Sequence, residues 1–107
     1  MVGLAITGAS RDPAAAPTTG EVQVLYLDPE VVGTGIGRTL FGHAVTDLAQ
    51  RGYAEATLWV LEGNQRARRF YEAAGWLPDG EARIEERPSA AFHEVRYRAT
   101  LAPNGPL

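Results

Sequence analysis

Three glycines stand at alternate positions in residues 31–38, between an apolar run at 22–27 and a helical pattern that starts near Ile36. Glycine permits positive φ and lets a ligand approach the main chain closely. The first amides of a helix have no partner inside the helix, and the helix dipole favours a negative charge beside them. A strand, a glycine turn and a helix start in this order predict a backbone site for phosphate or pyrophosphate.

Two common phosphate motifs do not fit this stretch. A dinucleotide fingerprint reads Gly-x-Gly-x-x-Gly, but its third glycine would fall on Arg38 counting from Gly33, or on Leu40 counting from Gly35. A nucleoside-triphosphate loop ends in Gly-Lys-Ser/Thr, and this chain contains no lysine. A turn whose glycines serve packing alone is the remaining alternative.

The spacing resembles the acetyl-CoA signature of the GNAT acetyltransferases, Gln/Arg-x-x-Gly-x-Gly/Ala. Gly33-Thr34-Gly35 matches its end, whereas Glu30 and Val32 stand where the family often has Gln or Arg. A second block, 58–64, is followed by Phe70-Tyr71 and Gly75-Trp76, a combination also typical of the family. The resemblance runs from about residue 2 to 101.

The pattern of the chain predicts one domain, 1–102, with a loose tail at 103–107. A helix is expected at 36–50, and Asn64 is expected to cap a second helix that ends near Gly75. A turn is expected at 78–80. The expected strands are 2–7, 21–27, 56–61, 82–86 and 94–101. These elements give the order β-β-α-β-α-β-β, and the resemblance implies an α/β (α+β) fold with a mixed, largely antiparallel sheet and two helices.

The resemblance also implies where acetyl transfer would take place. Tyr71 matches the tyrosine that faces the CoA sulfur, and a phenol can donate a proton to a departing thiolate. Glu21 could act as the base on the amine, and the Leu27 amide would donate to the thioester oxygen. The alternatives are that Tyr71 belongs to an apolar helix stripe and that Glu21 is an exposed strand-end carboxylate.

The acetyl-CoA contacts implied by the family are mostly main-chain groups around the glycine turn and the second helix. Arg66, Arg68 and Arg69 lie in the first turn of that helix, where cations oppose the helix dipole. A nearby anionic CoA, or pairing with Glu62 and Glu72, would relieve this conflict. The implied contacts are Leu25, Leu27, Val32, Gly33, Thr34, Gly35, Ile36, Gly37, Arg38, Thr39, Asn64, Arg66, Ala67 and Tyr71.

Composition is that of an ordinary globule, with 45% hydrophobic and 21% charged residues among 107. A net charge of −3 argues against a general nucleic-acid binder, and the absence of cysteine excludes thiolate chemistry. His43 and His93 lack metal-ligand spacing, so no metal is expected. Without a long apolar run, the sequence predicts a cytoplasmic protein that does not enter a membrane.

The family order normally begins with one further strand and two further helices, for which this sequence shows no counterpart. We therefore expect an exposed apolar surface, an unpaired edge at strand 2–7, and a homodimer or another subunit that covers both. The expected function is N-acetyltransfer from acetyl-CoA, or from another short acyl-CoA, to an unidentified primary amine. The alternative is a CoA-binding module or subunit without catalysis.

Overall fold

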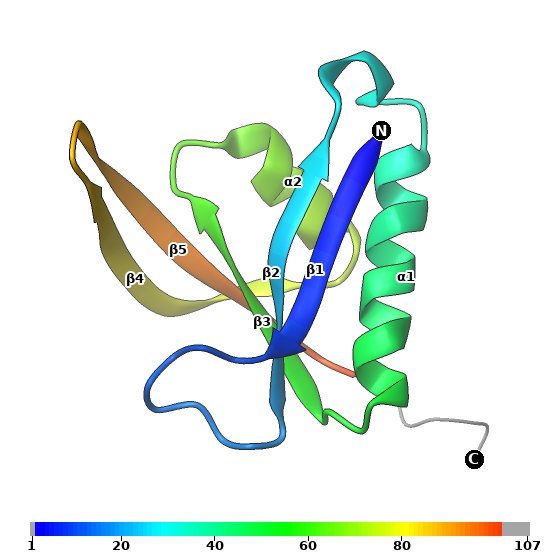
Figure 1. Ribbon diagram of the computed structural model, residues 1–107, viewed down its shortest axis with the longest axis vertical. Coiled ribbons are helices and arrows are strands. Elements are labelled where there is room, and N and C mark those ends of the chain that lie inside the picture. Colours follow the sequence, from blue (N-terminus) through cyan, green and yellow to red (C-terminus); the bar gives the residue numbers. More distant parts are fainter. Residues whose placement is uncertain (1, 102–107) are drawn as a thin grey trace. The chain divides into compact units, whose positions relative to one another are not determined.

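The computed structural model describes residues 2–101, and the strand order within them is β1-β2-β3-β5-β4 in one sheet (Figure 1). The element order confirms the expected β-β-α-β-α-β-β arrangement and the mixed α/β class. The expected tail at 103–107 lies outside the described residues. The elements are β1 (Gly3–Ala9), β2 (Thr19–Leu27), the 3₁₀ helix η1 (Pro29–Val31), α1 (Ile36–Gln50), β3 (Glu55–Leu61), α2 (Gln65–Ala73), β4 (Leu77–Arg87) and β5 (Ala90–Thr100).

The chain divides into two compact units, and β3 begins in the first and continues in the second. The first unit runs to Ala56 and includes Thr100 and Leu101. Its β1 and β2 form an antiparallel hairpin, and α1 packs against both strands. The apolar stripe of α1 supplies much of the core of this unit, as its helical spacing predicts. The buried apolar residues of this unit are Val22, Phe41, Ala44, Leu48, Ala56 and Leu101.

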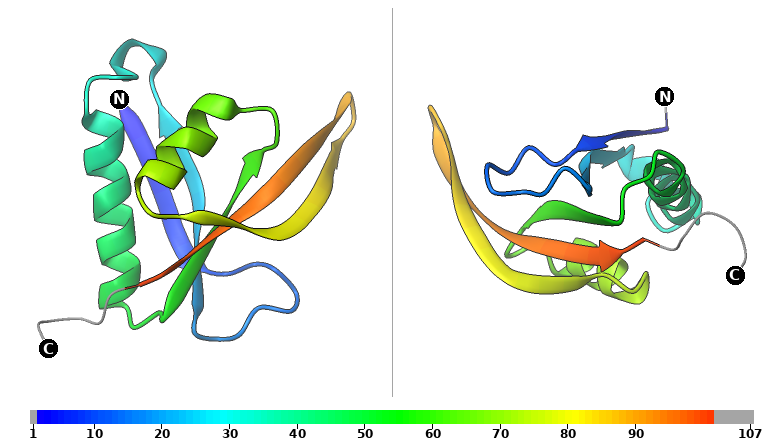
Figure 2. Two further views of the ribbon diagram at one scale, coloured as in Figure 1. Left: turned by 180° about the vertical axis from the view of Figure 1, so that it is seen from behind. Right: turned by 90° about the horizontal axis from the view of Figure 1, so that it is seen from below.

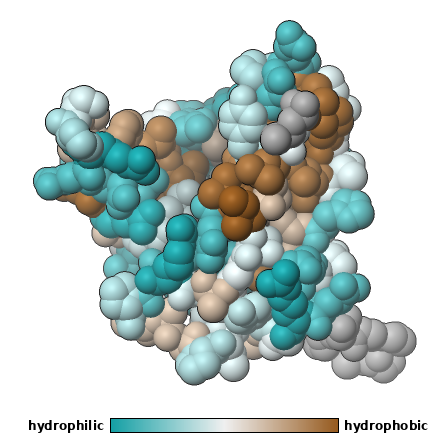
Figure 3. Space-filling model, viewed as in Figure 1, coloured by the Kyte–Doolittle hydropathy of each residue, from teal (hydrophilic) through white to brown (hydrophobic). Residues whose placement is uncertain are grey.

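One face of the β1–β2 hairpin carries exposed apolar side chains. In the strand register, Leu4 lies opposite Tyr26 and Ile6 opposite Val24. Directly opposed residues share a face of the sheet, and these four side chains are 41%, 51%, 42% and 39% exposed in that order. Figure 3 shows hydrophobic surface in the region where β1 and β2 lie. The exposed apolar surface expected from the sequence is therefore present.

The second unit, Thr57–Ala99, holds α2 against one face of its strands (Figure 2). Its buried apolar residues are Leu58, Val60, Tyr71, Trp76 and Tyr97. On β3, the half-buried Trp59 lies beneath Arg83, whose guanidinium carbon is 4.3 Å from the ring centroid. The apolar run of β3 predicts cover on both faces, and part of that cover comes from arginine stacked on Trp59.

One expected turn is instead part of a strand. Residues 78–80 were expected to be a turn before a strand at 82–86, but β4 runs from Leu77 to Arg87. The register against β5 shifts between Pro78 and Ala82, Gly80 has φ of 91°, and the Asp79 carboxylate accepts from the Glu81 amide at 3.0 Å. The Pro-Asp-Gly signal therefore marks an irregularity inside a long strand, because its turn geometry is absorbed as a bulge.

Candidate functional site

The glycine turn leads directly into α1. Gly33 and Gly35 have φ of 88° and 92°, a region that favours glycine over residues with a Cβ. A Cβ on Gly35 would have no heavy atom within 4 Å, so backbone conformation and space for a ligand explain this glycine better than packing does. Gly37 differs, because a Cβ there would lie 2.7 Å from Leu27 Cδ1. The glycines thus serve two purposes, an open turn and close packing of α1 on β2.

The start of α1 is open to an anion. Gly35 is its N-cap and provides no side-chain hydrogen bond to the first turn, and no acidic residue lies in that turn. The first backbone bond into the helix joins the Thr39 amide to the Gly35 carbonyl at 3.2 Å. The preceding amides therefore point toward a partner outside the helix. A hollow of about 500 Å³ lies here, lined by Thr34, Gly35, Ile36, Thr39, Leu40 and His43.

Three predicted acetyl-CoA contacts precede this turn in the chain: Leu25, Leu27 and Val32. Val32 follows η1, the short 3₁₀ helix that Asp28 caps by accepting from the Glu30 amide at 3.3 Å. Leu25 and Leu27 are half-buried and lie opposite Ala5 and Gly3 on β1. The described structure brings these residues together with Gly33 to Thr39 in the first unit. Arg38 is exposed at the same helix start.

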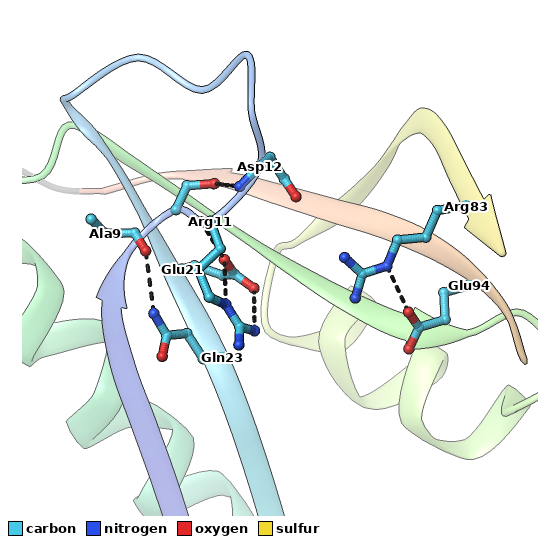
Figure 4. A network of polar contacts seen from close by, with 8 residues as sticks. Ala9, Arg11, Asp12, Glu21, Gln23, Arg83 and Glu94 are labelled. Atoms are coloured by element: carbon cyan, nitrogen blue, oxygen red, sulfur yellow. Dashed lines mark hydrogen bonds and ion pairs between the residues drawn. The ribbon is translucent and has the colours of Figure 1, made fainter. Parts of the chain in front are cut away.

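Glu21 is not the exposed strand-end carboxylate that was one alternative. It is 2% exposed and accepts three bonds from Arg11: from the backbone amide at 2.9 Å, from Nε at 3.5 Å and from Nη2 at 3.0 Å. Figure 4 shows the Arg11 guanidinium facing this carboxylate. Arg11 belongs to the β1–β2 loop, and its side chain is 58% exposed while that of Glu21 is 3% exposed. The loop arginine therefore covers a buried carboxylate.

Asn64, Ala67 and Arg66 lie at the start of α2 in the second unit. The Asn64 side chain accepts from the Ala67 amide at 3.1 Å, which confirms the expected cap. Arg66 is exposed, and no hydrogen bond or ion pair is recorded for it among the described residues. Arg68 behaves differently, because it donates to the Glu62 carbonyl at 2.8 Å and to the Tyr97 hydroxyl at 3.0 Å. Arg66 is therefore exposed to solvent, whereas the Arg68 guanidinium is held by two hydrogen-bond acceptors.

Tyr71 faces the core of the second unit. It is 9% exposed, contacts Phe70 edge to face at 5.5 Å between centroids, and lies 6.1 Å from the Tyr97 ring. Burial raises the pKa of the Tyr71 phenol above its ordinary value because the phenolate would be poorly solvated. The phenol therefore stays protonated at neutral pH, which suits a proton donor.

Tyr97 and Arg11 are the neighbours of the candidate site that sequence reasoning missed. Tyr97 lies in the strand expected at 94–101, and a strand pattern says nothing about the partners of a hydroxyl. Arg11 lies in a loop whose composition predicts only a turn-rich connection. The Tyr97 contacts join β5 to α2 and the Arg11 contacts cross the β1–β2 loop, so periodicity within one element could not reveal them.

The two histidines lie beside separate hollows. His43 lines the hollow at the start of α1, and His93 lines one of about 450 Å³ together with Asn64. No group of three or more metal-ligating side chains occurs in the described part of the chain. Between residues 2 and 101 there is also no helix with the length and apolar character needed to cross a membrane.

The predicted cofactor-binding residues fall into two groups, one in each unit, and comparisons with known proteins cover both. A model described as the acetyltransferase (GNAT) family matches residues 1–76. A protein named mycothiol acetyltransferase from Beutenbergia cavernae is 43% identical over 60 residues, which are 56% of this chain and 20% of that protein. The chain thus spans about a fifth of that relative's length.

Solved structures share the fold. The ribosomal-protein-S18-alanine N-acetyltransferase from Escherichia coli has a TM-score of 0.74 at 22% identity, covering 98% of this chain and 64% of that one. A Bacillus subtilis acetyltransferase in complex with CoA has a TM-score of 0.75 at 13% identity, covering 95% and 70%. The family model matches well over half of the sequence, and this shows that the chain belongs to the acetyltransferase (GNAT) family.

Proposed function

We propose that this chain binds acetyl-CoA and transfers the acetyl group to a primary amine by direct attack in a ternary complex. The observation that carries the proposal is the open glycine turn, whose positive-φ glycines lead into the uncapped start of α1 beside a hollow of about 500 Å³. The residues there fit a pyrophosphate, since unpaired amides and the helix dipole both favour an anion.

The rest of acetyl-CoA is assigned along β2 and α2. The pantetheine arm is rich in amides, so it can pair with strand amides near Leu25 and Leu27 like an added strand. Asn64 and Ala67 at the start of α2 would contact the same arm, and Arg38 and Arg66 would approach the phosphates. The Leu27 amide would then donate to the thioester oxygen as negative charge develops on it.

The acetyl group moves in a balanced exchange. The lone pair of a neutral amine attacks the thioester carbonyl carbon, and the tetrahedral intermediate expels the CoA sulfur as the carbon–sulfur bond breaks. Tyr71 gives its phenolic proton to the leaving sulfur, which yields the CoA thiol. The proton lost by the amine passes to Glu21, directly or through water, and solvent exchange restores both side chains.

Glu21 can act as this base only when the Arg11 guanidinium moves away from its carboxylate. The carboxylate is buried and bonded by Arg11, so an incoming ammonium group would compete with the guanidinium for the same oxygens. We expect acceptor binding to displace the Arg11 side chain, which is 58% exposed and lies at the surface. If Glu21 stayed bonded to Arg11 throughout catalysis, this ion pair would have a structural role alone.

The acceptor is proposed only as a primary amine. The names of the relatives belong to proteins of which this chain matches a minor part, so their acceptors are not transferred to it.

We further propose that the chain acts in the cytoplasm, since a chain without cysteine suits a reducing compartment. A second copy of the chain is the proposed cover for the apolar face of the β1–β2 hairpin, because its four apolar side chains are each more than a third exposed.

Calorimetric titration with acetyl-CoA tests the proposed donor site. Gly35→Val should weaken binding at least about tenfold, because a branched Cβ is strained at positive φ and occupies the ligand path. Gly42→Ala is the matched control, since Gly42 lies in α1 and a Cβ there also meets nothing within 4 Å. Unchanged affinity in a folded Gly35→Val variant would refute the placement.

A further inference from the structure

The Tyr97 hydroxyl joins two residues of α2 to β5. It donates to Glu72 Oε2 at 2.5 Å and accepts from Arg68 Nε at 3.0 Å, and the Tyr97 side chain is fully buried. Arg68 also donates to the Glu62 carbonyl at 2.8 Å, so its side chain links the turn before α2 to the Tyr97 hydroxyl. We call Arg68, Glu72 and Tyr97 the Tyr97 clasp.

The clasp has a geometric effect on the helix. Arg68 and Glu72 are four residues apart, so they lie on one side of α2 and one turn from each other. Two bonds from a single hydroxyl to these positions restrict both rotation of α2 about its axis and sliding along it. A helix of nine residues is marginally stable by itself, so its contacts with the rest of the unit decide both its stability and how it lies on the strands.

Tyr71 lies between the two clasped residues in the sequence of α2. Its ring centroid is 6.1 Å from that of Tyr97. Because Tyr71 is part of α2, a rotation of the helix would change the direction of the Tyr71 phenol. We propose that Tyr97 is a positioning residue, whose hydroxyl clasps α2 through Arg68 and Glu72 and thereby aims Tyr71 at the sulfur of the acyl donor. This rests on the proposed function, in which Tyr71 is the proton donor.

A purely structural role would look different. A buried hydroxyl requires hydrogen-bond partners in any fold, so the bonds alone would predict only a loss of stability when the hydroxyl is removed. Positioning predicts instead that the loss appears in turnover and disappears when Tyr71 has no proton to give. A small misplacement of a reacting group can cost up to about 100-fold in rate.

Tyr97→Phe removes only the clasping hydroxyl, and Tyr53→Phe is the matched control. Tyr53 lies in the other unit, and no hydrogen bond of its hydroxyl is recorded among the described residues. Steady-state kinetics of acetyl transfer should show kcat at least about tenfold lower in Tyr97→Phe, with the KM for acetyl-CoA unchanged. Glu72→Gln, which keeps a hydrogen-bond acceptor, should retain most of the turnover that Glu72→Ala loses.

A double-mutant cycle separates positioning from stability. In the Tyr71→Phe background, Tyr97→Phe should cause no further fall in kcat, because the group that it positions is already gone. Thermal unfolding of each variant is recorded alongside. Full independent losses in the double mutant, or an unchanged kcat with a lowered melting temperature in Tyr97→Phe, would overturn the proposal.

A spectroscopic readout decides the proposal even if the wild-type chain transfers no acetyl group, which would count against the proposed function alone. With tyrosine labelled at Cζ by ¹³C, the Tyr71 signal should shift or broaden in Tyr97→Phe and stay unchanged in Tyr53→Phe. A Tyr71 signal identical in wild type and Tyr97→Phe would show that the hydroxyl does not position Tyr71.

Discussion

Two buried tyrosines of the second unit, Tyr71 and Tyr97, have pKa values raised above the ordinary value of a phenol. Burial raises the pKa of Tyr71, and burial also raises that of Tyr97, where the Arg68 bond lowers the pKa and the Glu72 bond raises it by smaller amounts. At the residue scale, both phenols are therefore held protonated well beyond neutral pH. This is the protonation state that a donor to a thiolate requires.

A pH dependence of stability follows from these shifts. In the unfolded chain a tyrosine loses its proton near pH 10, whereas in the folded chain these two phenols keep theirs to higher pH. The unfolded state is thus stabilised first, so the free energy of unfolding should be constant up to about pH 9 and fall above about pH 10. The chain has no lysine to obscure this range.

Urea unfolding between about pH 8 and pH 11 measures this fall. Tyr71→Phe removes one of the two shifted phenols and should make the fall shallower than in the wild type. A free energy that rises with pH in this range, or an equal slope in wild type and Tyr71→Phe, would contradict the assignment of a raised pKa to Tyr71.

The residue types of the candidate site could be read from the sequence, but their partners could not. Glycine spacing and the Asn64 signal are local, and both features are present as expected. The bond from Arg68 to Tyr97 spans 29 residues and that from Arg11 to Glu21 crosses a loop. Such contacts depend on strand order and on side-chain direction, which a single sequence does not specify.

At the scale of elements, helix ends are the features that the sequence predicted best. α1 has the expected bounds, because a glycine turn precedes it and Gly52 follows it. β4 was predicted least well, since its Pro-Asp-Gly segment has the composition of a turn yet continues the strand. Cross-strand contacts from Asp79 to Arg96 at 2.7 Å and to Arg98 at 3.1 Å hold that segment against β5.

The cap of α2 supports a prediction that separates two roles of Asn64. Asn64→Ala should destabilise the chain by about 1 kcal/mol, because the Ala67 amide loses its partner. Asn64→Asp keeps a capping oxygen and should retain the stability. Thermal unfolding checks this, with about 4–8 °C expected per kcal/mol in a domain of this size. Equal melting temperatures for Asn64→Ala and Asn64→Asp would show that the cap contributes nothing.

The same pair tests the proposed contact with acetyl-CoA. If the Asn64 amide nitrogen donates to the pantetheine arm, Asn64→Asp should weaken acetyl-CoA binding although its helix remains capped. Calorimetry on the two variants measures this directly. An affinity of Asn64→Asp equal to that of the wild type would leave Asn64 as a helix cap alone.

At the scale of the whole molecule, the exposed face of the β1–β2 hairpin is the main unexplained surface. Leu4, Ile6, Val24 and Tyr26 are each more than a third exposed, and contiguous apolar surface on a soluble protein usually marks an interaction site. An exposed apolar surface was expected from the sequence, because the further strand and helices of the family have no counterpart in it. That expectation did not name this face of the hairpin, because the strand register that gathers the four side chains is not specified by the sequence.

We expect this face to pair with a second copy of the chain. Light scattering at micromolar concentration should give the mass of a dimer, and Ile6→Glu should give that of a monomer, because burying a carboxylate in an apolar interface is costly. Gln23→Glu adds the same charge at a half-buried position outside the four-residue face and is the control. A wild-type chain that stays monomeric and folded would contradict the dimer.

The central claim is acetyl transfer itself, and one assay tests it most directly. The chain is mixed with acetyl-CoA and a panel of amines: a small alkyl amine, an amino sugar and a peptide with a free N-terminal alanine. Mass spectrometry of the amine and thiol titration of the released CoA are measured together. We predict equal amounts of acetylated amine and CoA thiol, formed at least about 100-fold more slowly by Tyr71→Phe. Acetyl-CoA that binds but is never transferred to any amine, or a Tyr71→Phe variant as fast as the wild type, would contradict the account.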